Sequence, residues 1–247
     1  MPTELSVWDG LCSGAAIWAL AGALTGWGLE RLALWLPLKV LAPYGAQIRA
    51  EDWHGPGGGL TQVPRRSRQL ALALLNALAW AASAWAHPAQ GGAVVLVWAV
   101  CASVLLVLAV VDWNTTLLPD VLVLGLLWAG LLASERGWTL VPVATSLWSA
   151  VCWYVAMQAL AWTFERLTGR TGMGEGDAKL LAAMAAWWGG VPVIWALWWG
   201  SVLVILYGLI GRKRGMAAWS HVPFGPFLVI GLALWTAYRG LTGASSA

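Results

Sequence analysis

Apolar residues recur along the chain in eight long runs, separated by shorter polar connections. A helix needs about 20 apolar residues to cross a lipid bilayer. A helix also satisfies its own backbone hydrogen bonds, which a spanning segment must do. The pattern therefore predicts an all-α fold, a polytopic helical membrane protein with about eight transmembrane helices. The runs cover residues 11–35, 69–86, 92–111, 117–133, 140–162, 178–190, 192–211 and 223–240.

Composition supports a membrane protein, and the apolar runs divide the chain into three expected regions. The 247 residues are 60% hydrophobic and only 10% charged, which excludes an ordinary soluble domain. Residues 1–10 contain Glu4 and Asp9 but no Lys or Arg, so the first run predicts a retained helix rather than a cleaved signal peptide. We expect a first transmembrane helix over 1–36, a loop region over 37–68 and a seven-helix membrane domain over 69–247.

Basic residues alternate between the connections. All Lys and Arg except Arg136 and Arg239 lie at or beside the connections that follow the first, fifth and seventh runs. Loops rich in Lys and Arg stay in the cytoplasm, so both termini are predicted to face outward. Asp112 follows the third run and Asp177 precedes the sixth, which places both on the cytoplasmic side.

Asp112 and Asp177 are the candidate catalytic residues. An ionisable group close to a bilayer is costly and is usually kept for function. Two neighbouring carboxyl groups can share one proton, which gives an acid and a base at one site. The structural alternatives are a helix-end residue for Asp112 and a helix N-cap for Asp177. An anion at a helix C-terminus is electrostatically unfavourable, which counts against the first alternative.

Residues near these acids suggest a peptide-binding site. Gly174 and Gly176 let a backbone approach closely, which suits an extended substrate. Lys179 could hold a substrate carbonyl or lower the pKa of the pair, or it could snorkel to the interface. Pro223 and the proline after Gly225 could break a helix start and free backbone groups for a substrate, or simply form a helix-start turn.

Two further acids are interpreted structurally. Asp120 follows Pro119, an arrangement typical of a helix N-terminus, so a capping role is expected. Glu175 is expected to lie solvated in the loop before the sixth run. The cysteines and histidines are scattered and show no zinc-like spacing, so no metal site is predicted.

Three strings together resemble the type IV prepilin peptidases, over about residues 69–240. They are Asp112 with Leu117–Asp120, then Met173–Ala182, then Pro223–Phe227. The resemblance implies that Asp112 and Asp177 are the catalytic pair of an aspartic endopeptidase in the bacterial inner membrane, with its active site facing the cytoplasm. It also implies prepilin or pseudopilin substrates, which lose a short basic leader. Many members then methylate the new N-terminus with S-adenosylmethionine, whereas the cleavage needs no cofactor.

The first connection departs from the family pattern. Typical bifunctional members carry two zinc-binding CxxC pairs there, whereas Pro37–Arg68 contains no cysteine, so methylation stays open. The expected partners are pilin-type helices and membrane lipids, not nucleic acid. The acidic residues that could attract a basic leader are Glu51, Asp52, Glu165 and Glu175. The alternatives are a proton-coupled transporter, an inactive membrane scaffold and a presenilin-like protease.

Overall fold

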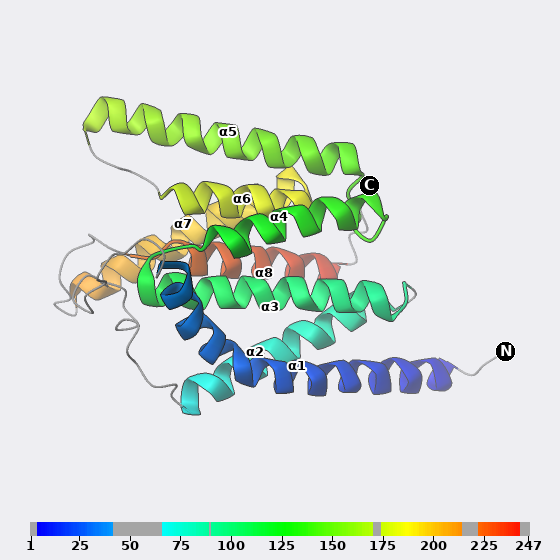
Figure 1. Cartoon of the computed structure of the whole chain (residues 1–247). Coiled ribbons are helices and arrows are strands. Elements are labelled where there is room, and N and C mark those ends of the chain that lie inside the picture. The colour runs from blue at the N-terminus through cyan, green and yellow to red at the C-terminus, as the bar shows by residue number, and fades with distance from the viewer. Residues whose placement is uncertain (1–3, 42–65, 89, 170–173, 214–221, 243–247) are drawn as a thin grey trace. The chain divides into compact units, whose positions relative to one another are not determined.

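A computed structural model describes residues 4–41, 66–88, 90–169, 174–213 and 222–242, and these residues form eight α-helices and no strand (Figure 1). Each of the eight expected helices is present, so the all-α fold is confirmed for the described residues. The helices are α1 Glu4–Leu41, α2 Arg66–Ala86, α3 Gly92–Thr115, α4 Asp120–Glu135, α5 Val143–Thr168, α6 Glu175–Trp188, α7 Gly190–Lys213 and α8 Gly225–Thr242.

The first helix is longer than the sequence predicts. It was expected to end near residue 36, but α1 has 38 residues and continues through Pro37 to Leu41. A proline removes only one helical hydrogen bond, and the Leu-Lys-Val-Leu sequence after it suits a helix. The start of the expected loop over 37–68 is therefore helical, and its residues 42–65 lie outside the described residues.

Four helices among the described residues are long and apolar enough to cross a membrane. They are α2, α3, α5 and the segment Gly190–Gly211 of α7. With 16 and 14 residues, α4 and α6 are shorter than a typical spanning helix. Nine of the 14 residues of α6 are buried, including every residue from Leu180 to Trp187, so the protein itself supplies most of its apolar surroundings.

The chain forms two compact units that meet inside α3, between Val110 and Val111. In the N-terminal unit, the side chain of Asn76 links three helices. Its Nδ2 donates to Gly22 O at 2.8 Å and to Thr25 Oγ1 at 3.0 Å, while Ser103 Oγ donates to Asn76 Oδ1 at 2.8 Å. Trp80 Nε1 completes the chain of bonds to Ser103 Oγ. In a membrane, the burial of apolar side chains does little to favour contact between helices over contact with lipid. Hydrogen bonds between helices such as these therefore help to hold them together.

In the C-terminal unit, α6 packs against α4, α5 and α7, and it lies between α5 and α4 in Figure 1. Trp187 Nε1 donates to the backbone oxygen of Leu126 in α4 at 2.8 Å, and Gly130 leaves room for the indole ring. On the other side, Ser146 of α5 donates to Ala186 O. These bonds fix the C-terminal end of α6, and the candidate residue Asp177 lies near its other end.

Candidate active site

Asp112 lies in the last turn of α3, directly after the apolar residues that bury this helix. The helix ends at Thr115, and Thr116 then adopts a left-handed conformation with φ 53°. The Thr116 N–H still donates to Asp112 O at 2.7 Å. This ending holds Asp112 in regular helix with its side chain 4% exposed.

The first residue of α8 donates a hydrogen bond to this carboxyl group. Gly225 N lies 2.8 Å from Asp112 Oδ2, and the bond is buried. The N-terminus of a helix carries a partial positive charge and unpaired N–H groups, both of which favour an anion. The Asp112 carboxylate therefore accepts a hydrogen bond from the N-terminus of α8, a helix that begins 113 positions later in the chain.

Asp177 is the third residue of α6, and its side chain turns back toward the start of its own helix. Gly174 is the N-cap with extended backbone, and it accepts a hydrogen bond from the Asp177 N–H at 3.1 Å. A Cβ placed on Gly174 would lie 3.3 Å from Asp177 Oδ2, so the absent side chain makes room for the carboxyl. Unlike Asp112, Asp177 is only partly buried.

The two carboxyl groups influence each other. The pKa of Asp177 is raised from 3.8 to about 7, by burial first and by the negative charge of Asp112 second, while a backbone hydrogen bond with Gly174 opposes both. Such an effect requires two carboxyls close together in a poorly hydrated place. The structure thus brings together the two acids that the sequence singled out, although they lie on different helices.

Gly176 also has a packing role. A Cβ on this residue would lie 3.0 Å from Leu118 Cβ, so the first turn of α6 is packed against the segment that joins α3 to α4. Pro223 is buried two residues before α8. Both residues therefore help to fix the helix ends on which the two carboxyls depend.

Lys179 forms two ion pairs rather than standing alone. Its Nζ lies 3.0 Å from Asp120 Oδ1 and 3.1 Å from Glu175 Oε1. The hydrogen bond with Asp120 is the main reason that the pKa of Lys179 is raised, and partial burial opposes it. The expectation of a loop position for Glu175 was wrong, because this residue begins α6 and sits one helical turn before Lys179.

An aromatic cluster beside Asp112 was not anticipated from the sequence. The ring of Trp113 lies 5.7 Å from that of Tyr207 and 6.3 Å from that of Phe227, and the last two rings are 5.7 Å apart. These rings join the end of α3 to α7 and to the start of α8. Edge-on aromatic contacts of this kind add to packing, so the cluster supports the contact between Asp112 and Gly225.

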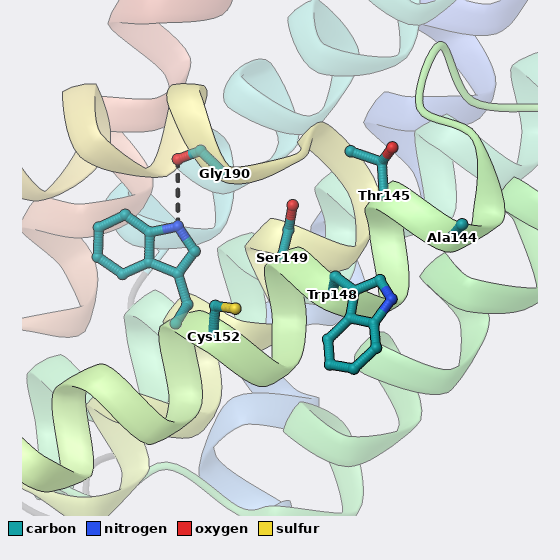
Figure 2. Close-up of a pocket in the computed structure, with 7 residues that line it drawn as sticks. Ala144, Thr145, Trp148, Ser149, Cys152 and Gly190 are labelled. Atoms are coloured by element: carbon teal, nitrogen blue, oxygen red, sulfur yellow. Dashed lines mark hydrogen bonds between the residues drawn. The ribbon is translucent and has the colours of Figure 1, made fainter.

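A hollow of about 430 Å³ in the same unit lies at the other end of α6. Figure 2 shows its wall on α5, with Trp148, Ser149 and Cys152. The indole N–H of Trp153 donates to Gly190 O at 3.2 Å. Gly190 follows Asp177 by a helix length of about 20 Å, so this hollow is separate from the carboxyl pair. Among the described residues, no group of three or more His, Cys, Asp and Glu side chains could hold a metal ion.

Three further residues that the sequence analysis named, Met173, Glu51 and Asp52, lie outside the described residues. Glu165 lies in the last turn of α5 and is exposed.

Comparison with known proteins identifies a family match for the segment that carries Asp112 and Asp177. The model of the type IV leader peptidase family matches residues 99–209, which include both Asp112 and Asp177. Residues 99–209 belong to the type IV leader peptidase family. The leader peptidase segment ends before α8, so Gly225 lies outside the match.

The relatives that match this chain have names that give two activities, leader peptidase and N-methyltransferase. The chain is 38% identical over 166 residues to the prepilin leader peptidase/N-methyltransferase of Pseudomonas aeruginosa, covering 66% of this chain and 54% of the relative. The protein of the same name from Aeromonas salmonicida is 40% identical over 129 residues, covering 51% and 44%. The chain spans about half the length of the curated relatives it matches. No solved structure matches the chain.

Proposed function

We propose that this protein is a membrane aspartic endopeptidase that removes the short basic leader from prepilins or pseudopilins. One observation carries the proposal: two acids on different helices, both inside the leader peptidase segment, lie close enough for the charge of one to raise the pKa of the other. A carboxyl pair that shares a proton is what general acid–base hydrolysis of a peptide requires.

The reaction is written for the pair as a unit. The ionised carboxylate takes one proton from a water molecule, whose oxygen bonds to the scissile carbonyl carbon. The protonated carboxyl gives its proton to the carbonyl oxygen. The tetrahedral intermediate then collapses as its C–N bond breaks: the carboxyl that took the water proton gives it to the departing amine, and the other carboxylate takes a proton back from a hydroxyl of the intermediate. Each carboxyl thus ends in its starting state, and no metal takes part.

The proposed substrate contacts surround the pair. They comprise Gly174, Gly176, Lys179, Pro223 and Gly225. The partial exposure of Asp177 supports access from this end of α6, whereas Asp112 is nearly enclosed. The Gly225 N–H already bonds to Asp112, so Gly225 would act on the substrate through that carboxyl.

The proposed setting is the bacterial inner membrane. All eight helices would span it or pack within it, in the order of a first helix that ends at Leu41, a connecting region and a membrane domain that begins with α2 at Arg66. The distribution of Lys and Arg supports an active site facing the cytoplasm. The substrate's apolar helix would then enter from the bilayer, with its basic leader outside the lipid.

Methylation of the new N-terminus is a possible second activity, since the relatives are named N-methyltransferases. The group donor would be S-adenosylmethionine. The hollow on α5 is lined by Trp148, Trp153 and small residues, without a carboxylate or amide for the ribose and amino groups of that cofactor. It does not fit the cofactor, so no methyl-transfer step is derived.

Substitution of each acid tests the peptidase. Asp112→Asn and Asp177→Asn should each abolish leader removal from a prepilin in lipid vesicles, while both variants still insert. Asp120→Asn is the matched control, because this acid is exposed and paired with Lys179. Normal processing by either of the first two variants would contradict the mechanism.

A further inference from the structure

The hydrogen bond between Gly225 and Asp112 distinguishes the two acids. Gly225 begins α8, and the next residue, Pro226, has no N–H. The following N–H groups, of Phe227 and Leu228, donate to Phe224 O at 3.1 Å each. Among these first N–H groups of α8, that of Gly225 is therefore the one that donates to another helix, α3.

Such a donor favours the charged form of its acceptor. A hydrogen bond to an ionised carboxylate is about twice as strong as one between neutral groups. The positive end of the α8 dipole acts in the same direction. Because Asp112 is only 4% exposed, water contributes little to the solvation of its charge, and the protein must supply it.

The surroundings of Asp177 favour a proton there. Burial and then the charge of Asp112 raise the pKa of Asp177, despite the opposing bond with Gly174. The nearest cation along α6, Lys179, is engaged by Asp120 and Glu175. Its positive charge is largely offset by these partners, so it does little to favour an anion at Asp177.

We infer that the start of α8 is a positioning element, in which the Gly225 N–H holds Asp112 as the ionised member of the pair and leaves the shared proton on Asp177. This inference rests on the proposed function, and it assigns the two roles within it. Asp112 takes the proton of the attacking water, and Asp177 gives its proton to the carbonyl oxygen. Gly225 acts through Asp112 and is a positioning residue.

The position also requires glycine. A Cβ on Gly225 would lie 2.8 Å from Asp112 Oδ2, 3.3 Å from Cγ and 3.4 Å from Cβ. A methyl group there pushes the carboxylate off its donor. Gly225→Ala should therefore weaken the hydrogen bond while leaving both acids in the chain.

The test measures where the proton resides, without any substrate. The full chain, labelled with ¹³C at the aspartate carboxyl carbons, is placed in lipid nanodiscs and titrated by NMR, and Asp112→Asn and Asp177→Asn assign the two signals. At a pH where the pair holds one proton, the wild-type Asp177 signal should be at its protonated position. In Gly225→Ala the proton should move toward Asp112, with a roughly tenfold change in partition.

Two glycines of the same helix provide matched controls. A Cβ at Gly231 would lie 2.5 Å from Ala196 O, so Gly231→Ala disturbs the packing of α8 on α7, whereas Gly240 has no neighbour within 4 Å. Neither substitution should change the proton partition. With an uncleaved prepilin as substrate, Gly225→Ala should lower kcat roughly tenfold and change KM by less than about threefold.

Three results would overturn the inference: a wild-type proton on Asp112, an unchanged partition in Gly225→Ala, or an equal change in Gly231→Ala. The wild-type titration decides the matter even where Gly225→Ala fails to fold. A protein that partitions the proton as described but cuts no prepilin would contradict the proposed function instead.

Discussion

Lys179 of α6 and Asp120 of α4 form a two-pronged ion pair, with Nζ 3.0 Å and 3.1 Å from the two carboxylate oxygens. Glu175 adds a third contact at 3.1 Å. Because the partners keep Lys179 protonated, it is a fixed cation in the first turns of α6. Its ion pairs steady the start of α6, and the second role that we propose for it is to bind a substrate carbonyl.

These two roles of Lys179 predict different kinetics. The side chain of Asp120 is 56% exposed, so the ion pair should contribute less than about 1 kcal/mol to unfolding. If Lys179 binds the substrate, Lys179→Ala should raise KM several-fold more than Asp120→Ala does. Peptidase assays with a prepilin measure both values, and Glu135→Ala, which removes an exposed pair elsewhere, is the control. Equal KM values for Lys179→Ala and Asp120→Ala would mean that Lys179 has only a structural role.

The packing of α6 on α4 predicts a stability difference between two glycines. A Cβ at Gly130 would lie 2.6 Å from Trp187 Cδ1, whereas one at Gly125 of the same helix has no neighbour within 4 Å. Gly130→Ala should displace the indole from Leu126 O and lower the free energy of unfolding by about 1–3 kcal/mol. Gly125→Ala should be neutral or slightly stabilising. Thermal unfolding in detergent compares them, and equal midpoints would argue against this packing.

The raised pKa of Asp177 predicts a stability that depends on pH. Between its ordinary value of 3.8 and its folded value of about 7, the folded protein holds a proton that the unfolded chain has lost. Stability gained from this group is complete below pH 4 and is lost as the pH rises toward 7. Asp177→Asn, which cannot titrate, should show a smaller fall over this range. Denaturant unfolding at several pH values measures it, and identical slopes for both proteins would contradict the shift.

The same pKa predicts the alkaline side of the activity profile. The pair needs one proton to work, and Asp177 loses it near pH 7. The cleavage rate should therefore decline as the pH rises above about 7. A rate that keeps rising to pH 9, in vesicles that remain intact, would show that the proton on Asp177 is not required.

The polar network of the N-terminal unit predicts a moderate loss of stability. Asn76 is fully buried and bonds to Gly22, Thr25 and Ser103. Asn76→Ala should cost about 1–2 kcal/mol. The control is Ser83→Ala, since the hydroxyl group of Ser83 donates to Ala79 O within its own helix. Thermal unfolding separates the two, and an equal loss would mean that the network does not join the helices.

Sequence pattern alone placed the helices and chose the acids. Apolar runs of helical length reflect burial along the chain, so each predicted run overlaps one helix, with ends that differ by up to seven residues. Asp112 and Asp177 stood out because a carboxyl group at the end of an apolar run is costly to place near the bilayer and is usually kept for function. The extension of α1 through Pro37 was missed because a proline usually ends a helix and here is carried within it.

Contacts between distant helices left no trace in the pattern. The bond from Gly225 to Asp112 spans 113 positions and that from Lys179 to Asp120 spans 59. A backbone N–H is the same in every residue, so a donor role for Gly225 has no sequence signature. The glycine itself was a usable signal, since it marks a place where a side chain would collide.

The most direct measurement is the intact mass of a prepilin produced together with this protein in cells. With the wild-type chain, the prepilin should lose its leader, and a further methyl group would reveal the second activity. With Asp177→Asn at equal abundance in the membrane, the full-length mass should remain, and with Asp120→Asn the leader should again be lost. Removal of the leader by Asp177→Asn would contradict the account of the carboxyl pair.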